Sequence, residues 1–172
     1  LYDMGSHLVD TASFISGERI SEVYCRTQTC LNRRQGARGW ENVETDDGAC
    51  MIASGENTLY DLSVTRVGPG PLQLTVTGDG GMLDLRIGAA EPLLFWKKDK
   101  QGGYATRAQA VPNSNSPQQE WFCRQAKAFL DRIEGNDTEI SSLAESGYVD
   151  EVLLAAARSA HTKRTETVGA GR

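Results

Sequence analysis

Asp3 and His7 stand four residues apart in the opening stretch LYDMGSHLVD. If a helix starts here, both side chains lie on one face about one turn apart. A carboxylate in that position can orient an imidazole ring and stabilise the imidazolium that forms when histidine takes up a proton. The pair therefore predicts proton chemistry. The structural alternative is that Asp3 or Ser6 caps the helix while His7 packs at its start.

Little protein precedes this pair. Leu1 is not an initiator methionine, and nothing ahead of Asp3 could hold a substrate or cofactor against it. Either the pair is structural, or the sequence is part of a longer protein.

A second group of candidate residues is the basic cluster of Arg33, Arg34 and Arg38 within LNRRQGARGWENVETDD. The planar guanidinium group offers a fork of donors that matches phosphate or carboxylate. The same composition is typical of a solvated loop, and we expect a polar loop between two strands here. Both interpretations of the cluster remain open.

Glycine-rich turns raise the possibility of a nucleotide site, but their spacing does not fit one. In GDGGMLDL the pair Gly78 and Gly80 is not followed by a third glycine three residues on, and a strand rather than a helix is expected next. We predict a hairpin turn. Gly169-Ala-Gly has no helix after it to receive a phosphate, so the chain is predicted to have no dinucleotide site of its own.

The composition of the chain limits the classes of partner that it is expected to bind. The 172 residues fit one domain, and a net charge of −5 argues against a nucleic-acid surface. No apolar run is long enough for a membrane span and no signal-peptide pattern is present, which favours a cytoplasmic protein. The four cysteines form no C-x-x-C pair, so we expect buried, reduced thiols and no metal site.

The elements that would position the pair are a short helix, a sheet and two later helices. Apolar spacing predicts a helix from Asp3 to Ser16 that stops at Gly17, and then strands with alternating polarity. One face carries Leu74, Val76, Leu83 and Leu85, and we expect two later helices to cover it. Ser116-Pro117 and Ser142 with Glu145 predict their starts. The fold class is α+β, a predominantly antiparallel open sheet with helices packed on one face. The segment from Lys98 to Ser116 reads as a loop, and Lys163–Val168 as a last edge strand.

The opening motif and the order of segments resemble a known family. Asp3, Gly5, His7 and Asp10 follow the D-x-G-x-H-x-x-D pattern of the Gfo/Idh/MocA proteins (glucose-fructose oxidoreductase, inositol dehydrogenase and rhizopine catabolism). ETDDGACMIAS, LQLTVTGDGGMLDL, FCRQAKAFLDRIEG and VDEVLLAAARSAHTKRTETV resemble later segments of the same C-terminal domain. The resemblance covers nearly all of residues 1–172, as a single C-terminal domain.

The resemblance implies a second domain. Family members begin with a Rossmann domain that carries a G-x-G-x-x-G turn and a lysine in an E-K-P motif, and neither is found here. We therefore expect an N-terminal Rossmann domain to be absent from this chain. The cofactor implied is NAD or NADP, bound mainly by that domain; the cofactor-binding residues are unknown.

The activity implied is hydride transfer from a carbon that bears a hydroxyl group, on a sugar, polyol or derivative. The resemblance gives His7 as the catalytic base, Asp3 as its partner and Asp10 as a further residue that binds a substrate hydroxyl, although a structural role for Asp10 fits equally well. The polar face of the sheet is either solvated or the contact face of a homo-oligomer. The alternative function is a non-enzymatic scaffold or oligomerisation module that retains the fold.

Overall fold

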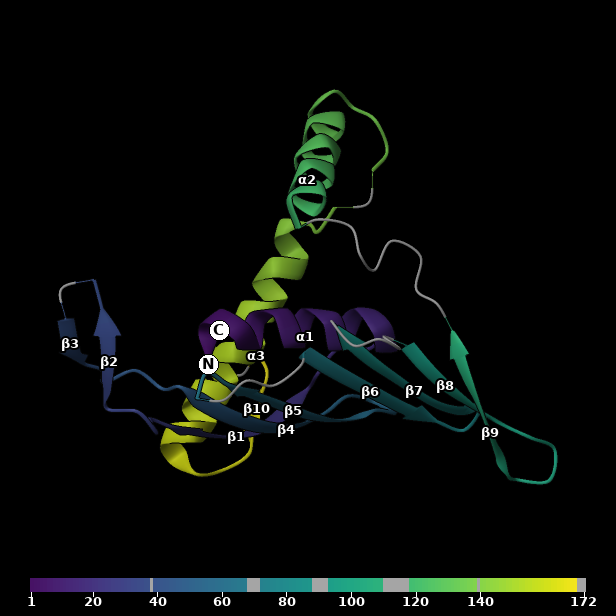
Figure 1. Cartoon of the computed structure of the whole chain (residues 1–172), viewed down its shortest axis with the longest axis horizontal. Coiled ribbons are helices and arrows are strands. Elements are labelled where there is room, and N and C mark those ends of the chain that lie inside the picture. The colour runs from purple at the N-terminus through teal and green to yellow at the C-terminus, as the bar shows by residue number, and fades with distance from the viewer. Residues whose placement is uncertain (38, 68–71, 88–92, 110–117, 139, 170–172) are drawn as a thin grey trace. The chain divides into compact units, whose positions relative to one another are not determined.

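The computed structural model describes residues 1–37, 39–67, 72–87, 93–109, 118–138 and 140–169 (Figure 1). The chain forms two compact units. One combines Leu1–Gly68 with Ser141–Arg172, and the other is Pro69–Ile140. The candidate residues near the N-terminus all belong to the first unit.

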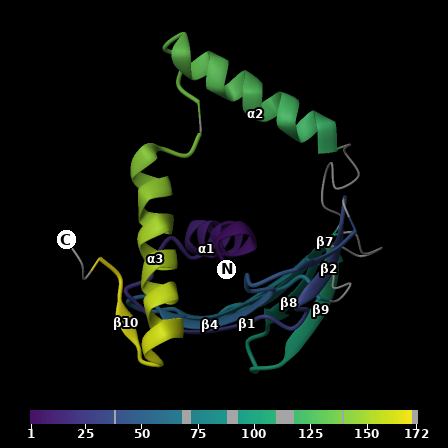
Figure 2. The same ribbon diagram turned by 90° about the vertical axis from the view of Figure 1, so that its left-hand side faces the viewer.

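The first unit is a layer of two helices on an antiparallel sheet, with a separate hairpin. Its elements are α1 (Tyr2–Ser16), β1 (Glu22–Gln28), β2 (Arg33–Gly36), β3 (Gly39–Asn42), β4 (Gly48–Ser54), β5 (Leu59–Thr65), α3 (Leu143–Thr162) and β10 (Glu166–Thr167). The sheet has the order β10-β1-β4-β5, and β2 pairs with β3 alone. Figure 2 shows α1 beside α3, and the C-terminal half of α3 next to β10 at the edge of the sheet.

Helix α1 ends where the sequence predicts. Gly17 adopts the left-handed conformation, with φ 69°, and its N–H donates to the carbonyl of Ser13 at 3.0 Å. Glycine reaches this conformation at little cost because it has no Cβ. Gly5, Val9 and Ala12 form the buried side of the helix.

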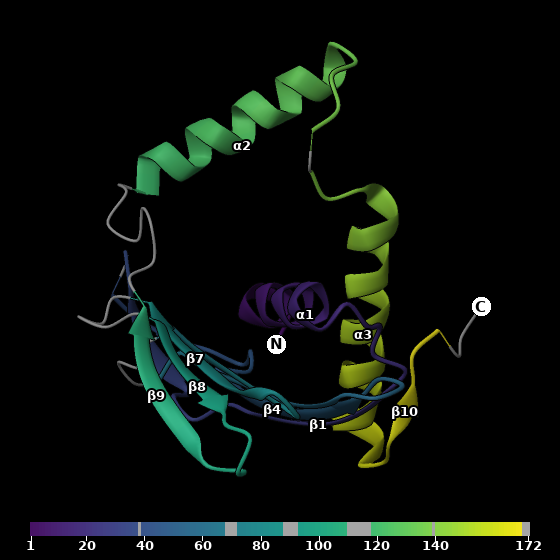
Figure 3. The same cartoon turned by 90° about the vertical axis from the view of Figure 1, so that its right-hand side faces the viewer.

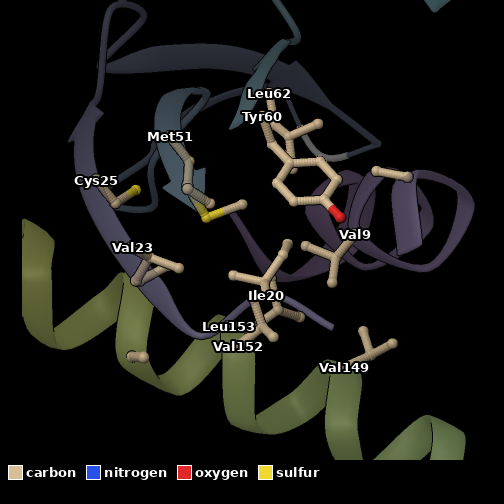
Figure 4. Packing of buried hydrophobic residues seen from close by; sticks show 14 of the residues in the cluster. Val9, Ile20, Val23, Cys25, Met51, Tyr60, Leu62, Val149, Val152 and Leu153 are labelled. Carbon is tan, nitrogen blue, oxygen red and sulfur yellow. The ribbon is translucent and has the colours of Figure 1, made fainter. Parts of the chain in front are cut away.

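Helix α3 supplies one side of the core. Its start is the predicted capping box: the Glu145 N–H donates to Ser142 Oγ at 3.2 Å, and the Ser142 N–H donates to the Glu145 carboxylate at 2.6 Å. Val149, Val152 and Leu153 then pack with Val9, Ile20, Val23, Cys25, Met51, Tyr60 and Leu62 (Figure 4). Burial of this apolar surface is the main force that joins α3 to the sheet.

The second unit holds a four-stranded antiparallel sheet and one helix. Its elements are β6 (Leu72–Gly78), β7 (Gly81–Ile87), β8 (Leu93–Lys98), β9 (Tyr104–Gln109) and α2 (Gln118–Ile133). The strand order is β6-β7-β8-β9, and Figure 3 shows the last three strands side by side. The predicted hairpin between β6 and β7 is confirmed, with Gly78 opposite Gly81. A Cβ on Gly81 would collide with the Trp96 carbonyl oxygen, so this position needs glycine.

One face of the second sheet carries a buried carboxylate. Asp84 accepts hydrogen bonds from Gln73 Nε2 at 2.9 Å, Thr75 Oγ1 at 3.2 Å and Arg86 Nε at 2.8 Å. Burial works to raise the pKa of Asp84, but the bonds from Gln73, Arg86 and Thr75 outweigh it and hold the pKa below its ordinary value. The polar face is therefore an organised network and not merely a row of solvated side chains.

The predicted α+β class with antiparallel strands is confirmed, but several details were wrong. The described strands form three sheets, and the apolar face of α3 packs on β1 rather than on the face of Leu74 and Leu85. Helix α2 does not cover that face with its apolar side chains either, because Phe122, Phe129, Leu130 and Ile133 are exposed. The predicted loop after β1 contains the β2–β3 hairpin, and the predicted loop after β8 contains β9. The last edge strand is confirmed as β10, whereas the Ser116-Pro117 start of α2 lies outside the described residues.

The cysteine and membrane expectations have mixed outcomes. All four cysteines are free, but only Cys25 is buried; Cys30, Cys50 and Cys123 are exposed, so the expectation of buried thiols holds for one of them. Burial raises the pKa of Cys25 to about 11. Among the described residues, no helix combines the length and the apolar character that a bilayer span requires.

Candidate active site

Helix α1 places the predicted site residues on one face. Asp3, His7 and Asp10 are spaced by four and three residues, so they project from the same side of the helix. All three are exposed, on the side opposite the buried Val9. The arrangement gives two carboxylates and one imidazole a common, accessible surface over two helical turns.

Gly5 explains how this face is held in place. A Cβ on Gly5 would lie 3.3 Å from the Leu153 side chain of α3 and 3.3 Å from that of Leu1, closer than most real contacts. Glycine lets α1 approach α3 closely. The glycine of the D-x-G-x-H pattern therefore fixes the helix that carries the acid and the histidine.

The Asp3 carboxylate is paired with Arg66, the residue that follows β5. No hydrogen bond joins Asp3 to His7, and His7 has no hydrogen-bond partner in the described part of the chain. Leu1 occupies the N-cap position of α1 without a side-chain capping bond, and Ser6 Oγ donates to the Asp3 carbonyl at 2.9 Å. The alternative in which Asp3 or Ser6 caps this helix is therefore wrong.

A pocket of about 350 Å³ opens beside the first turn of α1. It is lined by residues 1–4, Arg34, 45–48 and 64–66. Asp3 and Arg66 both belong to its wall, and His7 does not. The pocket thus adjoins the acidic end of the candidate face and combines cationic, anionic and hydroxyl groups.

Asp47 is the buried anion of this pocket. Its carboxylate accepts from the N–H groups of Cys30 at 2.6 Å and Leu31 at 2.8 Å, and Arg34 lies 3.2 Å away. The hydrogen bond from Cys30 is the largest influence and, against the effect of burial, the Leu31 and Arg34 contacts help to lower the pKa of Asp47 to about 2. Asp47 is ionised at neutral pH and ties β2 to the end of β1.

The basic cluster is largely engaged within the protein. Arg34 is paired with Asp47, and the Arg33 guanidinium lies over the Trp40 ring, 5.9 Å from its centroid. Arg38 lies outside the described residues. These contacts favour the structural interpretation for Arg33 and Arg34, because cation–π and ion-pair contacts already occupy them.

Neither a cluster of metal ligands nor a dinucleotide-binding fold is found among the described residues. No group of three or more potential metal ligands is found among them. Every strand pair in the described ranges is antiparallel, and the glycine turn at residues 78–81 joins two strands. A dinucleotide cradle needs a parallel strand, a glycine turn and a helix N-terminus, so the residues present do not fit this cofactor.

The sequence of residues 1–84 matches the model of a known family. The profile of the GFO/IDH/MocA C-terminal domain matches residues 1–84. Residues 1–84 therefore resemble a GFO/IDH/MocA C-terminal domain. The matched region includes the D-x-G-x-H-x-x-D motif, so the resemblance predicted from Asp3, Gly5, His7 and Asp10 is confirmed. No curated protein matches the chain in sequence.

Solved structures share the fold of this chain. An oxidoreductase domain protein from Kribbella flavida is 23% identical, with a TM-score of 0.79 over 96% of this chain and 49% of that one. Levoglucosan dehydrogenase in its apo form is 19% identical, with a TM-score of 0.81 over 96% and 50%. A super-repressor mutant of Gal80p from Saccharomyces cerevisiae is 12% identical, with a TM-score of 0.77 over 96% and 48%. The chain spans about half the length of these structures.

Sequence reasoning missed Arg66 and Asp47 as parts of this region. Arg66 stands in TLYDLSVTRV, where it reads as the polar end of a strand, and Asp47 reads as part of a solvated loop. One feature of the sequence could have indicated a structural role for Asp47. It stands two residues before a position of β4 that is buried, in a segment rich in residues that form turns.

Proposed function

We propose that this domain is the substrate-binding and catalytic-base domain of an NAD(P)-dependent oxidoreductase that acts on a hydroxyl group of a sugar, polyol or derivative. The observation that carries the proposal is the shared, exposed face of Asp3, His7 and Asp10 within the family-matched residues 1–84. Levoglucosan dehydrogenase, which shares the fold, has been crystallised with NADH and levoglucosan and with NADH and L-sorbose. These sugars indicate the substrate class to test first.

In this proposal His7 moves the proton. Oxidation of a carbinol removes a hydride from carbon and a proton from the hydroxyl oxygen, and the proton needs an acceptor. The unprotonated ring nitrogen of His7 accepts it and returns it in the reverse reaction. Histidine suits this step because its ordinary titration range lies near neutral pH. The exposed position of His7 leaves the ring accessible to a substrate.

Asp3 and Asp10 bind substrate hydroxyl groups on either side of His7. Each carboxylate is acceptor-only when ionised, so it matches the donor of a hydroxyl group. Asp10 lies less than one turn beyond His7, and Asp3 lies one turn before it. Three acceptors along one helix face can hold successive hydroxyl groups of a polyol while His7 takes the proton of one of them.

The cofactor belongs to another part of the proposed enzyme. Since the described residues make no dinucleotide cradle, we assign NAD or NADP to an N-terminal Rossmann domain, with residues 1–172 as the single C-terminal domain. When bound, the nicotinamide would accept the hydride. This chain contributes the proton acceptor and the hydroxyl ligands.

A homo-oligomer through the open sheet face and a cytoplasmic location complete the proposal. The polar face around Asp84, with Gln73, Thr75 and Arg86, offers an ordered polar surface that a second copy could match. All four cysteines are free, which is typical of proteins kept in a reducing compartment.

A non-enzymatic scaffold or oligomerisation module is the second candidate. The likeness to a super-repressor mutant of Gal80p supports it, because that protein is described as a repressor and nevertheless shares the fold. A shared fold does not decide between catalysis and regulation. The site residues are what separate the two.

The decisive experiment compares His7→Gln with His161→Gln in the complete protein. Initial rates of NAD and NADP reduction are measured with levoglucosan, L-sorbose and a panel of polyols. We expect His7→Gln to lower kcat by about a hundredfold or more, the usual scale for a general base. His161 is an exposed histidine near the end of α3 and serves as the matched control, with kcat unchanged. An active protein that keeps its kcat in His7→Gln would remove His7 from the mechanism, and no turnover with any pair would favour the scaffold.

A further inference from the structure

The Asp3 carboxylate has two possible partners. His7 lies one turn along the same helix, within reach of an i, i+4 interaction, and Arg66 lies across from α1 at the end of β5. The structure pairs Asp3 with Arg66 and leaves His7 without a hydrogen-bond partner among the described residues. The acid is therefore paired with Arg66 and not with His7.

We propose that Arg66 is a positioning residue, which holds the Asp3 carboxylate on the pocket wall as a ligand for a substrate hydroxyl and keeps it from pairing with His7. The inference rests on the proposed function and deepens it. It gives the two residues separate roles: Asp3 binds a substrate hydroxyl group, and His7 transfers the proton.

The position of Arg66 is itself fixed by backbone contacts. Its N–H donates to the carbonyl of Asp47 at 2.8 Å, next to the pairing of Thr65 with Gly48. The Asp47 carboxylate is fully buried and bound by two backbone N–H groups and by Arg34. Arg66 thus emerges from a rigid junction and presents its guanidinium to the first turn of α1. A fixed base of this kind is what a positioning residue requires.

The charges around Asp3 favour this division. Arg66 and Arg34 face the pocket as cations, and Asp46 and Asp47 face it as anions. On its own helix, Asp3 is followed by His7 and Asp10. Helix α3, packed on the other side of α1, contributes the uncharged Leu153 and the Tyr148 hydroxyl, which lies 3.2 Å from Ser13 Oγ. Arg66 is therefore the cation paired with Asp3 in the described residues.

The pairing has a consequence for the titration of His7. An unpaired Asp3 carboxylate would stabilise the imidazolium and raise the pH at which His7 is half protonated. In the structure the charge of Asp3 is paired with that of Arg66. Loss of Arg66 frees Asp3, so the His7 titration should move to higher pH.

The test is a double-mutant cycle that reads this titration by NMR. Histidine-labelled protein is followed through pH in four forms: wild type, Arg66→Gln, Asp3→Asn and the double variant; His7→Gln assigns the signal. We expect Arg66→Gln to raise the His7 midpoint by about 0.5 pH unit, the size of a Coulomb interaction over one helical turn in high dielectric. In the Asp3→Asn background the shift should fall to less than half, because only the direct repulsion by Arg66 is then lost. Equal shifts in the two backgrounds would overturn the proposal.

Kinetics with levoglucosan, or with the most active polyol of the panel, give a second readout. Arg66→Gln should raise KM by about threefold to tenfold with a smaller effect on kcat, since a displaced Asp3 weakens uniform substrate binding. In Arg66→Lys the KM should lie closer to the wild-type value than in Arg66→Gln, because lysine keeps the positive charge. Arg158→Gln removes another paired arginine from the same unit and should leave KM unchanged. An unchanged KM in Arg66→Gln also contradicts the proposal. If His7→Gln shows that His7 is not catalytic, the NMR cycle still decides the role of Arg66 separately.

Discussion

Asp47 alone contacts three segments of the chain that are separate in sequence. Its carboxylate binds the backbone after β1 and lies beside Arg34 of β2, while its carbonyl accepts from Arg66 after β5. The carboxylate is ionised down to unusually low pH, because these donors favour its charged form. One residue thereby ties these three segments together beside the candidate site.

The low pKa of Asp47 predicts a specific pH dependence of stability. Because its pKa falls from an ordinary 3.8 to about 2 on folding, Asp47 contributes stability that is fully present above about pH 4 and is lost as the pH falls through about 2. We expect the difference in free energy of unfolding between wild type and Asp47→Asn to be largest at pH 7 and to shrink between pH 4 and pH 2. Urea denaturation across pH measures it. Asp61→Asn, at an exposed position of β5, is the control and should show no such trend; a difference that stays constant down to pH 2 would contradict the assignment.

At this scale the sequence identifies candidates but not their partners. The four-residue spacing of Asp3 and His7 correctly places both on one helix face. It also suggests that they interact, whereas the carboxylate turns to Arg66. Nothing local marks Arg66 as that partner, since the two residues meet only when β5 and α1 pack together.

At the scale of elements, Ser159 links α3 to β1. The Ser159 hydroxyl is fully buried, accepts from the Cys25 N–H at 2.8 Å and donates to the Arg164 carbonyl at 2.5 Å. Cys25 belongs to β1, and Arg164 follows the end of α3. One hydroxyl therefore satisfies a strand donor and a carbonyl beyond the helix C-terminus inside the core.

Ser159→Ala tests this link. Removal of the hydroxyl leaves the buried Cys25 N–H without its partner, at a cost of about 1–3 kcal/mol in the free energy of unfolding. Guanidinium denaturation measures the change. Ser146→Ala, at an exposed position of the same helix, should change stability by at most about 0.5 kcal/mol. A Ser159→Ala variant as stable as the control would show that this hydrogen bond makes no net contribution to the free energy of unfolding.

Elements with alternating or helical apolar spacing were predictable, and exposed ones were not. Helix α1 ends as predicted at Gly17, and β10 lies within the predicted edge strand Lys163–Val168. Neither strand of the β2–β3 hairpin has a buried residue. Its sequence therefore lacks the alternation of apolar and polar residues from which a strand is predicted. The sheet that receives α3 was misassigned because both sheets present an apolar face of the same period, and periodicity cannot choose between them.

At the scale of the molecule, the part of the chain that the structure describes lacks the architecture for a dinucleotide. The described strands pair only in antiparallel fashion, so no helix N-terminus follows a parallel strand to receive a pyrophosphate. We predict no binding of NAD(H) or NADP(H) to residues 1–172 alone in calorimetric titration. The complete protein, with its proposed Rossmann domain, is the positive control. Tight binding of either cofactor to these residues alone would contradict the assignment of the cofactor to another domain.

The first unit is built from two stretches of chain that are far apart, residues 1–68 and 141–172, with the second unit encoded between them. During synthesis, β1, β4 and β5 leave the ribosome long before α3, which supplies Val149, Val152 and Leu153 to their core. At a usual rate of 5–20 residues per second, residues 69–160 take on the order of 5 to 20 seconds to translate. For that interval the apolar face of the first sheet has no α3 to cover it. The nascent chain at this stage is a natural client for a chaperone that binds exposed strands, and its yield should depend on translation speed between residues 69 and 160.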